Sequence, residues 1–343
     1  KSLFTDKVQT TISITLSEAY QIIQDDYLIA ETFNTFFSKV VENLCLDRID
    51  NSLVHPIRSN DPIISCIMKY KEHPSIIKIK GTISKSNINS TFSFAPTNIN
   101  NVYTEICNLS GSKSSPKDAI PANIIKDNRD IFATKILIDF NRSIQDGYFP
   151  DNLKLADVSP IFKKEDRLDK SNYRPVSILP PVSKIFERLL FTQINEFMDS
   201  KLSLYQCGFR KNMSAQNCLL YMIEKWKKSL DSKGKAGVLL TDLSKAFDSL
   251  DHGLLIAKLE AYGFSYEALK LIHSYLKNRF QRVKINSSYS RWIEIIFGVP
   301  QGSILGPILF NIFLADLFLF CTEIDIANFA DDNSPFCCAN DIN

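Results

Sequence analysis

Residues 324–332 read Ile-Asp-Ile-Ala-Asn-Phe-Ala-Asp-Asp, and this stretch decides the fold prediction. Its alternation predicts a strand that ends at Phe329, followed by a tight hairpin turn carrying Asp331 and Asp332. Upstream, the apolar run at residues 238–241 stops on Asp242, which predicts a short buried strand, Gly237–Thr241, with a carboxylate at its end. Hard carboxylate oxygens suit Mg²⁺, which shares its coordination shell with substrate phosphates. The pattern therefore predicts a divalent metal site.

The segment between the two acidic sites supports the same chemistry. Residues 298–302 read Gly-Val-Pro-Gln-Gly, immediately before an apolar helix expected from Ser303. Two metal ions about 4 Å apart can clamp the attacking and leaving oxygens of a phosphoryl displacement. The carboxylates thus favour nucleotidyl transfer. Any single Asp at such a place could be a cap or turn residue. That alternative explains poorly two acidic segments in order with Gly-Val-Pro-Gln-Gly between them.

In order, residues 241–248 (Thr-Asp-Leu-Ser-Lys-Ala-Phe-Asp), 298–303 (Gly-Val-Pro-Gln-Gly-Ser) and 329–332 resemble the reverse transcriptases of non-LTR, LINE-type, jockey-like retrotransposons. Residues 172–177 (Asn-Tyr-Arg-Pro-Val-Ser) and 206–210 (Gln-Cys-Gly-Phe-Arg) resemble the fingers motifs of that family. A bare Asp-Asp pair is weak evidence, whereas the ordered set of motifs is specific.

The resemblance implies an α/β (α+β) fold with the fingers and palm of a right-hand polymerase. The palm would be an antiparallel, ferredoxin-like sheet backed by helices, and the thumb would be absent. The implied domains are an N-terminal helical connector and linker at 1–100, fingers at 101–236 and a truncated palm at 237–343. Because the chain opens on Lys1 rather than Met, we expect a piece of a longer reading frame.

The resemblance also assigns the site residues and their partners. Lysine and arginine suit phosphate oxygens as a point cation and a bidentate donor, and an aromatic residue after the first acid crowds the sugar 2′ position. The implied partners are an RNA template, a DNA primer and dNTPs, the implied cofactor is two Mg²⁺ ions with Mn²⁺ as an alternative, and the implied location is nucleus and cytoplasm. The catalytic and metal residues are Asp242, Asp331 and Asp332; the nucleotide-binding residues are Lys163, Arg174, Phe247, Gln301 and Gly302; the template-binding residues are Gln206, Gly208, Phe209 and Arg210.

Several alternatives remain open. Lys163 could lie on a solvated basic face, and Phe209 and Phe247 could be core residues. Asp248 resembles the second acid of RNA-dependent RNA polymerases, so that class and intron-encoded maturases are rivals. The non-enzymatic rival is a truncated, inactive element relic that at most binds nucleic acid.

Composition is that of a globular protein. The 343 residues are 45% hydrophobic and 23% charged, which excludes disorder, and the net charge is only +2. The charge is nevertheless uneven: residues 201–235 carry 8 basic and 2 acidic side chains, and residues 265–292 carry 6 and 1. Such segments suit a phosphate backbone, although a solvated lysine face is the alternative. The eight cysteines show no C-x-x-C pair, which excludes a zinc knuckle here and fits reduced thiols.

The remaining sequence predicts mostly helices. A capping box at Thr15 and Glu18 predicts a helix over 17–44 with Phe33, Phe37, Val40 and Leu44 on one face. Residues 47–101 are expected to be a linker with short elements. Further helices are expected at 98–109, 131–146 and 182–200, with Asp251 capping another. The apolar segment 304–320 contains Asp316 and is predicted to be a buried helix, not a membrane span. Pro335 predicts an edge or irregular return strand.

Overall fold

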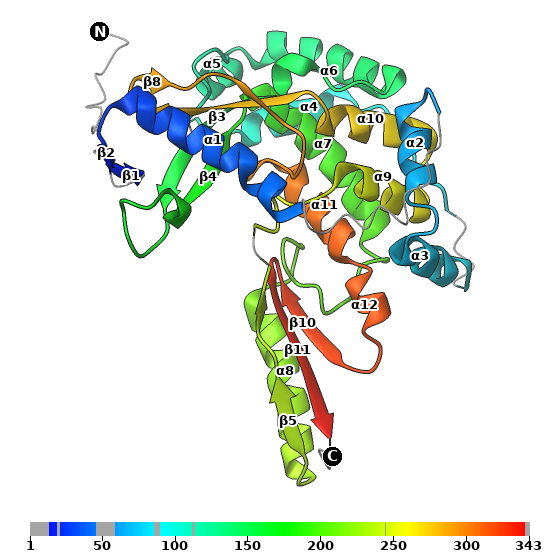
Figure 1. Ribbon diagram of the computed structural model, residues 1–343. Coiled ribbons are helices and arrows are strands. Elements are labelled where there is room, and N and C mark those ends of the chain that lie inside the picture. The colour runs from blue at the N-terminus through cyan, green and yellow to red at the C-terminus, as the bar shows by residue number, and fades with distance from the viewer. Residues whose placement is uncertain are drawn as a thin grey trace.

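The computed structural model describes residues 14–18, 21–45, 59–85, 90–111, 114–243 and 245–339. In Figure 1 an upper body of helices and one sheet continues downward into a narrower sheet with a single helix beside it. The first described residues lie in the upper body, and the last described strand ends at the lower tip. Helices occur together with parallel and antiparallel strands, so the predicted α/β class is confirmed.

The upper body contains a five-stranded mixed sheet in the order β4-β3-β7-β8, with β9 also paired to β7. β3 and β7 run parallel, and the other pairs are antiparallel. The strands are β3 (Leu155–Phe162), β4 (Tyr173–Ile178), β7 (Arg279–Ile285), β8 (Ser288–Tyr289) and β9 (Ile293–Ile295). This sheet takes strands from both sides of residue 237, where the palm was predicted to begin. The division into domains stays a prediction.

Helix α1 (Asp26–Cys45) covers one face of this sheet (Figure 1). The ring of Phe33 is fully buried there, edge-on to Tyr173 with ring centres 4.9 Å apart. Side chains alternate between the faces of a strand, so their neighbours point the other way. Ile161 and Val176 are exposed on that second face, which is open to solvent.

The start of α1 differs from the prediction. Residues before it form a hairpin of β1 (Leu16–Glu18) and β2 (Gln21–Ile23), so the predicted capping box at Thr15 and Glu18 is wrong. Asp25 instead accepts a hydrogen bond from the Leu28 amide at 2.9 Å, as a helix cap does. Leu16 is buried against the sheet, which holds the chain in the hairpin.

The predicted apolar face of α1 is partly described. Phe33 and Phe37 are buried as expected. The side chains of Val40 and Leu44 lie outside the described residues.

The helices of the upper body share one large apolar core, with Phe140, Phe186, Leu255 and Ile308 among its fully buried residues. The helices predicted near 98–109, 131–146 and 182–200 are confirmed. The buried apolar helix predicted over 304–320 is confirmed only as far as Leu314, because a separate short helix follows at Leu317–Phe320 and has no buried residue. The core helices are α4 (Ile99–Asn108), α6 (Arg129–Asp146), α7 (Pro181–Met198), α9 (His252–Ala261), α10 (Tyr266–Leu276) and α11 (Leu305–Leu314); the shorter elements are α5 (Ala122–Asp127), α12 (Leu317–Phe320), η2 (Asp151–Leu153) and η3 (Lys170–Asn172).

Much of the predicted linker is part of this core. Helix α2 (Pro62–Lys69) and helix α3 (Pro74–Lys85) both pack against α9. Ile63, Ile76 and Ile79 are buried in the contact. The short elements expected here are present, but the prediction missed that they pack into the core. Their isoleucines recur at helical spacing, a signal that the surrounding Asn and Ser content obscured.

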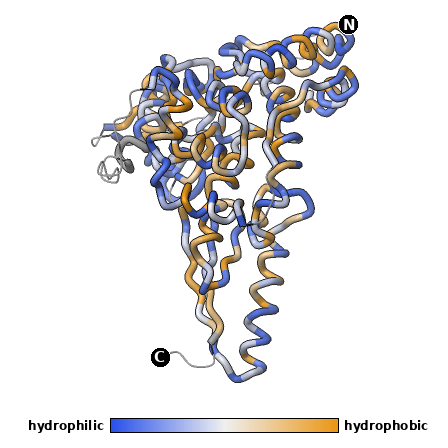
Figure 2. Tube along the Cα trace, turned by 90° about the vertical axis from the view of Figure 1, so that its right-hand side faces the viewer, coloured by the Kyte–Doolittle hydropathy of each residue, from blue (hydrophilic) through white to orange (hydrophobic). Residues whose placement is uncertain are grey.

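The lower extension is a second, antiparallel sheet in the order β10-β11-β5, with β6 paired to the other end of β11. Its strands are β5 (Lys235–Val238), β6 (Thr241–Asp242), β10 (Asp325–Phe329) and β11 (Asp332–Ala339). Helix α8 (Ala215–Asp231) lies along one face, where Phe336 is buried with Cys218 and Met222. In Figure 2 the strands of this extension carry mostly apolar residues, whereas α8 alternates between polar and apolar ones.

The strand predicted as buried over Gly237–Thr241 is broken and exposed. β5 ends at Val238 and β6 begins at Thr241, and between them Leu239 and Leu240 are 63% and 78% exposed. The apolar run indicated a strand correctly but not its surroundings, because one face of this small sheet has no helix on it within the described residues.

Pro335 was expected at an edge or in an irregular strand. β11 is central rather than at an edge, lying between β10 and the β5–β6 segment. The ladder on the β5–β6 side is nevertheless irregular, since Pro335 faces the interruption between those strands and only accepts, from the Leu239 amide at 2.9 Å. The missing amide hydrogen of proline is therefore tolerated at this gap.

Two further expectations concern membranes and thiols. Among the described helices, none is long and apolar enough to cross a membrane. The cysteines with described side chains are free thiols. Cys337 and Cys338 lie in β11 as expected for a strand, but their side chains are exposed rather than packed.

Candidate active site

The Gly-Val-Pro-Gln-Gly segment is tied along its length to the segment that follows Asp242. The amides of Gly298 and Val299 donate to the carbonyl oxygens of Leu250 and Phe247, at 2.8 and 2.9 Å. Gly298 has φ +74°, and a Cβ there would lie 2.6 Å from the Phe247 oxygen. Only glycine allows this approach. Two segments far apart in sequence are thus locked together.

A buried histidine completes this lock. His252 is 5% exposed, and its Nε2 lies 2.7 Å from the Gly298 carbonyl oxygen. A carbonyl only accepts, so Nε2 carries the hydrogen and the ring is neutral. Burial lowers the pKa of His252 to about 4. No pattern in the sequence indicates this role of His252.

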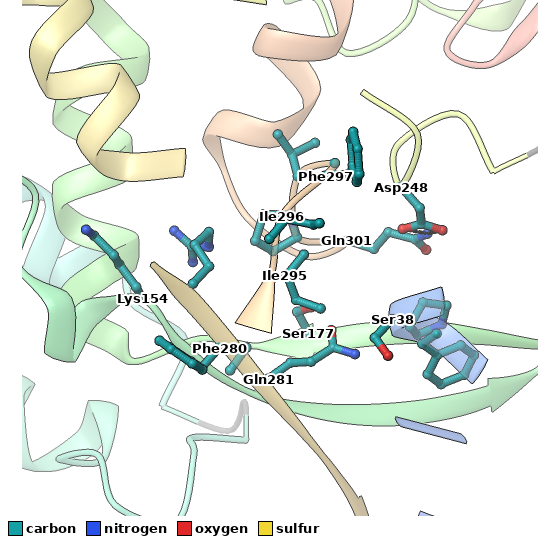
Figure 3. A pocket seen from close by; sticks show the side chains of 17 residues that line it. Ser38, Lys154, Ser177, Asp248, Phe280, Gln281, Ile295, Ile296, Phe297 and Gln301 are labelled. Carbon is teal, nitrogen blue, oxygen red and sulfur yellow. Dashed lines mark hydrogen bonds between the residues drawn. The ribbon is translucent and has the colours of Figure 1, made fainter. Parts of the chain in front are cut away.

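Gln301 is held from both sides. Its Nε2 donates to both oxygens of the Asp248 carboxylate, at 3.0 Å each (Figure 3). Its carbonyl accepts from the Ser177 amide of β4 at 2.7 Å. Gly302 follows with φ +124°, and a Cβ there would lie 2.5 Å from the Ser177 oxygen, so this glycine allows a close backbone approach to β4. Burial raises the pKa of Asp248.

The hairpin tip is folded by two amide side chains. Asn328 and Asn333 face each other across β10 and β11, and both are buried. Asn328 Nδ2 donates to the Ala330 oxygen at 2.8 Å, and Asn333 Nδ2 donates to the Asp331 oxygen at 3.3 Å. These bonds stabilise the turn, in which Ala330 has φ +60°. Asn333 therefore has a structural role at this turn.

The predicted template loop supports this hairpin from behind. Gly208 packs so closely on the tip that a Cβ would lie 2.1 Å from the Ala330 nitrogen. Gln206 is fully buried and donates to the Asn311 oxygen, while Arg210 donates to backbone oxygens and to Asp199. These two side chains hold the loop in place. Contact of these two side chains with a template stays a prediction. In this geometry they would act on a template by holding the loop in position.

Phe209 is the exposed member of that loop. Its ring is 43% exposed and meets the ring of Phe247 edge-on at 5.6 Å, and Phe247 stacks on Phe310 at 4.7 Å. Phe247 is half-buried and lines a cavity. It therefore serves both as a packed residue and as part of a cavity wall.

This cavity, of about 450 Å³, brings most of the predicted site together. Its wall includes two acids and three cations from four chain segments: Asp242, Asp331, Lys163, Arg174 and Lys245. Within the described part of the chain, none of these five side chains forms an ion pair or a side-chain hydrogen bond. Unpaired charges of both signs at one cavity indicate a ligand with two kinds of group. Phosphates would meet the cations, and a metal ion or proton donors would meet the carboxylates.

Of the predicted catalytic and nucleotide-binding residues, two lie outside this wall. Asp332 is exposed and sits directly opposite Asp242 in the β6–β11 register, and Gly302 connects Gln301 to β4. Lys245 is the residue that sequence reasoning missed, although it stands within the quoted segment after Asp242. Among described residues, no three His, Cys, Asp or Glu side chains cluster as a metal cage.

A model of a known protein family matches the part of the chain that contains this cavity. Residues 161–341 match the family model described as reverse transcriptase (RNA-dependent DNA polymerase). The chain belongs to the reverse transcriptase family. The match covers the cavity, the hairpin and the Gly-Val-Pro-Gln-Gly segment.

Curated relatives narrow the group within the reverse transcriptases. The chain is 33% identical over 237 residues to an RNA-directed DNA polymerase from the mobile element jockey of Drosophila funebris, covering 64% of this chain and 26% of that protein. It is 34% identical over 207 residues to a probable RNA-directed DNA polymerase from transposon X-element of Drosophila melanogaster, covering 57% and 22%. A probable RNA-directed DNA polymerase from transposon BS of the same species is 32% identical over 181 residues, covering 52% and 20%.

These relatives support a jockey-like, non-LTR reverse transcriptase. The chain spans only about a quarter or less of their length. The roles of the individual site residues stay predictions, because no bound ligand tests them.

Proposed function

We propose that this chain contains the fingers and palm of an RNA-directed DNA polymerase of a non-LTR retrotransposon, in the right-hand arrangement. The reaction is addition of a dNTP to a primer 3′ hydroxyl on an RNA template, with pyrophosphate leaving. The observation that carries the proposal is the cavity at which two carboxylates and three cations lie unpaired beside Phe247 and Gln301. The relatives' names support the same activity.

The cation side of the cavity suits a triphosphate. Lys163 follows β3, and Arg174 lies in β4, the strand paired with it. Both side chains are exposed. The ammonium group offers a point charge and the guanidinium a two-pronged donor, so together they would bind and orient phosphate oxygens. Lys245, from the segment that follows Asp242, adds a third positive charge.

The acidic side suits a divalent ion. Asp242 and Asp331 supply hard oxygen donors on one wall, and Mg²⁺ typically takes one or two carboxylates plus substrate phosphates rather than an all-protein cage. The donor set therefore fits Mg²⁺, or Mn²⁺, without a three-acid cluster. When bound, two such ions would supply charge stabilisation for in-line phosphoryl transfer. Asp332, opposite Asp242, would support that site electrostatically.

The half-exposed Phe247 suits a deoxyribose gate. Its ring is fixed between Phe310 and Phe209, so it cannot move aside without disturbing both contacts. A fixed ring beside the sugar would exclude a 2′ hydroxyl by its volume. This role favours DNA synthesis over RNA synthesis.

The test is Mg²⁺-dependent primer extension on an RNA template by the chain as given, with dNTPs and rNTPs in parallel. Asp331→Asn is the main variant, and Asp332→Asn is its matched neighbour outside the cavity wall. We expect dNTP extension that is abolished by the first change and reduced less by the second. Extension with rNTPs would support an RNA polymerase instead. Template binding without any extension would contradict the enzymatic proposal and favour the relic.

A cellular location in cytoplasm and nucleus is part of this proposal, as a retroelement ribonucleoprotein requires. Fractionation of cells that express a tagged chain together with its RNA would test it. Confinement to one compartment would contradict it.

A further inference from the structure

The face of the five-stranded sheet turned away from α1 carries a row of aromatic and basic side chains. In the strand register, Asp157 pairs with Arg282 and Lys284 pairs with Tyr289. Ile293 pairs with Gln281, so Trp292, one residue before it, lies opposite Arg282. Paired residues of neighbouring strands point to the same face. This face lies opposite the one covered by α1.

Arg282 is the fixed centre of this row. Its guanidinium lies 4.4 Å from the ring centre of Tyr289 and 4.5 Å from that of Trp292. Its nitrogens bind Asp157 at 2.7 Å and Asp118 at 2.8 Å. The two acids compensate its charge, so Arg282 acts as a rigid support for the rings rather than as a phosphate ligand. Trp292 is held by this support, yet 38% of it remains exposed.

Two lysines lie beside the ring of Tyr289. Lys117, from the segment that crosses this face, lies 5.4 Å from the Tyr289 ring centre, and Lys284 lies 5.6 Å from it. Neither lysine forms an ion pair within the described residues. The nearby acids Asp118 and Asp157 are already bound to Arg282, and the exposed Glu294 lies opposite Phe280, away from the lysine end.

The same face leads to the candidate active site. Asp157, Ser159 and Ile161 alternate along β3 on this side, and Ile161 is paired with Arg174. Arg174 lines the cavity that holds Asp242 and Asp331. A chain lying across the sheet from Trp292 would therefore reach the cavity.

We propose that Trp292, Arg282, Tyr289, Lys117 and Lys284, the Trp292 platform, bind single-stranded RNA next to the catalytic cavity. A base stacks on the exposed ring of Trp292, and the two lysines bind phosphates. An exposed, rigid aromatic ring flanked by unpaired cations is the combination that single strands require. The identity of this strand as the template rests on the proposed function, whereas its binding does not.

The experiment measures the affinity of the whole chain for a short, fluorescently labelled oligouridylate by anisotropy, without metal or nucleotides. Trp292→Ala is expected to weaken binding about tenfold or more, and Trp292→Phe to retain most of it. Lys117→Gln with Lys284→Gln is expected to reduce the slope of log K against log salt by about 1.4, since each phosphate contact of a single strand contributes about 0.7.

The matched control is the pair Lys78 and Phe320, which has the same exposed cation-and-ring chemistry between α3 and α12. Phe320→Ala and Lys78→Gln are expected to leave affinity unchanged. Equal losses in the control and platform variants, or unchanged affinity in Trp292→Ala with native circular dichroism, would overturn the proposal. An equal loss for duplex RNA would also overturn it, because paired bases cannot stack on the ring.

Because this assay needs no catalysis, the two proposals fail separately. A chain without extension activity whose RNA affinity depends on Trp292 contradicts only the proposed function. A chain that extends primers with unchanged affinity in Trp292→Ala contradicts only the platform.

Discussion

The side-chain nitrogen of Gln301 donates to Asp248 and lies 3.0 Å from each carboxylate oxygen. Only the Oε1 of Gln301 therefore remains free to face the cavity. The carboxylate thereby decides which end of the amide is left for a ligand in the cavity. A carboxylate accepts only, whereas an amide in its place could also donate and allow Gln301 to turn over.

We therefore expect Asp248→Asn to lower kcat/KM for dNTPs about tenfold, since a hydrogen bond to a charged group is worth about 1.5–3 kcal/mol. Single-nucleotide extension kinetics would measure it. Asp139→Asn, which touches only the surface Lys135, is the control. An unchanged kcat/KM would show that Asp248 does not orient Gln301.

Gly208 sets the position of the acidic hairpin. A Cβ at this residue would lie 2.1 Å from the Ala330 nitrogen, so Gly208→Ala must displace the loop or the tip that carries Asp331. We expect extension to fall about a hundredfold, because small misplacements of catalytic groups are costly. Gly237→Ala is the control in the same sheet, where the nearest atom is Cys337 Sγ at 3.8 Å. Similar activity of both variants would disprove the positioning role.

Phe247 and Phe209 are expected to act together in sugar selection. Phe247→Val removes ring volume beside the cavity, and we expect the preference for dNTPs over rNTPs to fall about tenfold or more, the scale for a pocket that gains space. Phe209→Ala should lower it by less, since Phe209 supports the ring from its edge. Competition between the two nucleotide types measures the ratio. Discrimination that stays at the wild-type level in Phe247→Val would remove the gate assignment.

His252 makes stability depend on pH. Its pKa is about 4 in the folded chain and 6.5 in the unfolded chain, so the unfolded state binds a proton first as the pH falls. Stability is therefore complete above about pH 6.5 and declines towards pH 4, by about 2 kcal/mol at pH 5.

Urea unfolding at neutral and acidic pH would measure this loss. His252→Gln keeps a nitrogen donor for the Gly298 oxygen but does not titrate, so it should lose less stability in acid. His73 and His273, whose pKa values burial also lowers, titrate in both proteins and cancel in the comparison. Parallel pH curves for the two proteins would contradict the assignment.

The sequence singled out the residues around the cavity better than the residues that support them. Asp242, Asp331, Lys163 and Arg174 stand within or beside the ordered motifs that carry the family resemblance, and all four line one cavity. Asn328, His252 and the contact of Gly208 with Ala330 were not, since their roles depend on partners distant in sequence. The hairpin β1–β2 was missed because Thr15 and Glu18 match a helix cap locally, and only the burial of Leu16 in the sheet decides otherwise.

The covering of β3 by α1 has a practical consequence for expression. The family match begins at residue 161, inside β3, and a protein started there would lose most of the strand that precedes Lys163. It would also lose Phe33 and Leu16, leaving the apolar side of β3, β4 and β7 in water. The boundary inferred from homology is therefore not a folding boundary. A segment designed for expression should begin before β1, because the cavity at Lys163 and Arg174 depends on residues that the family match omits.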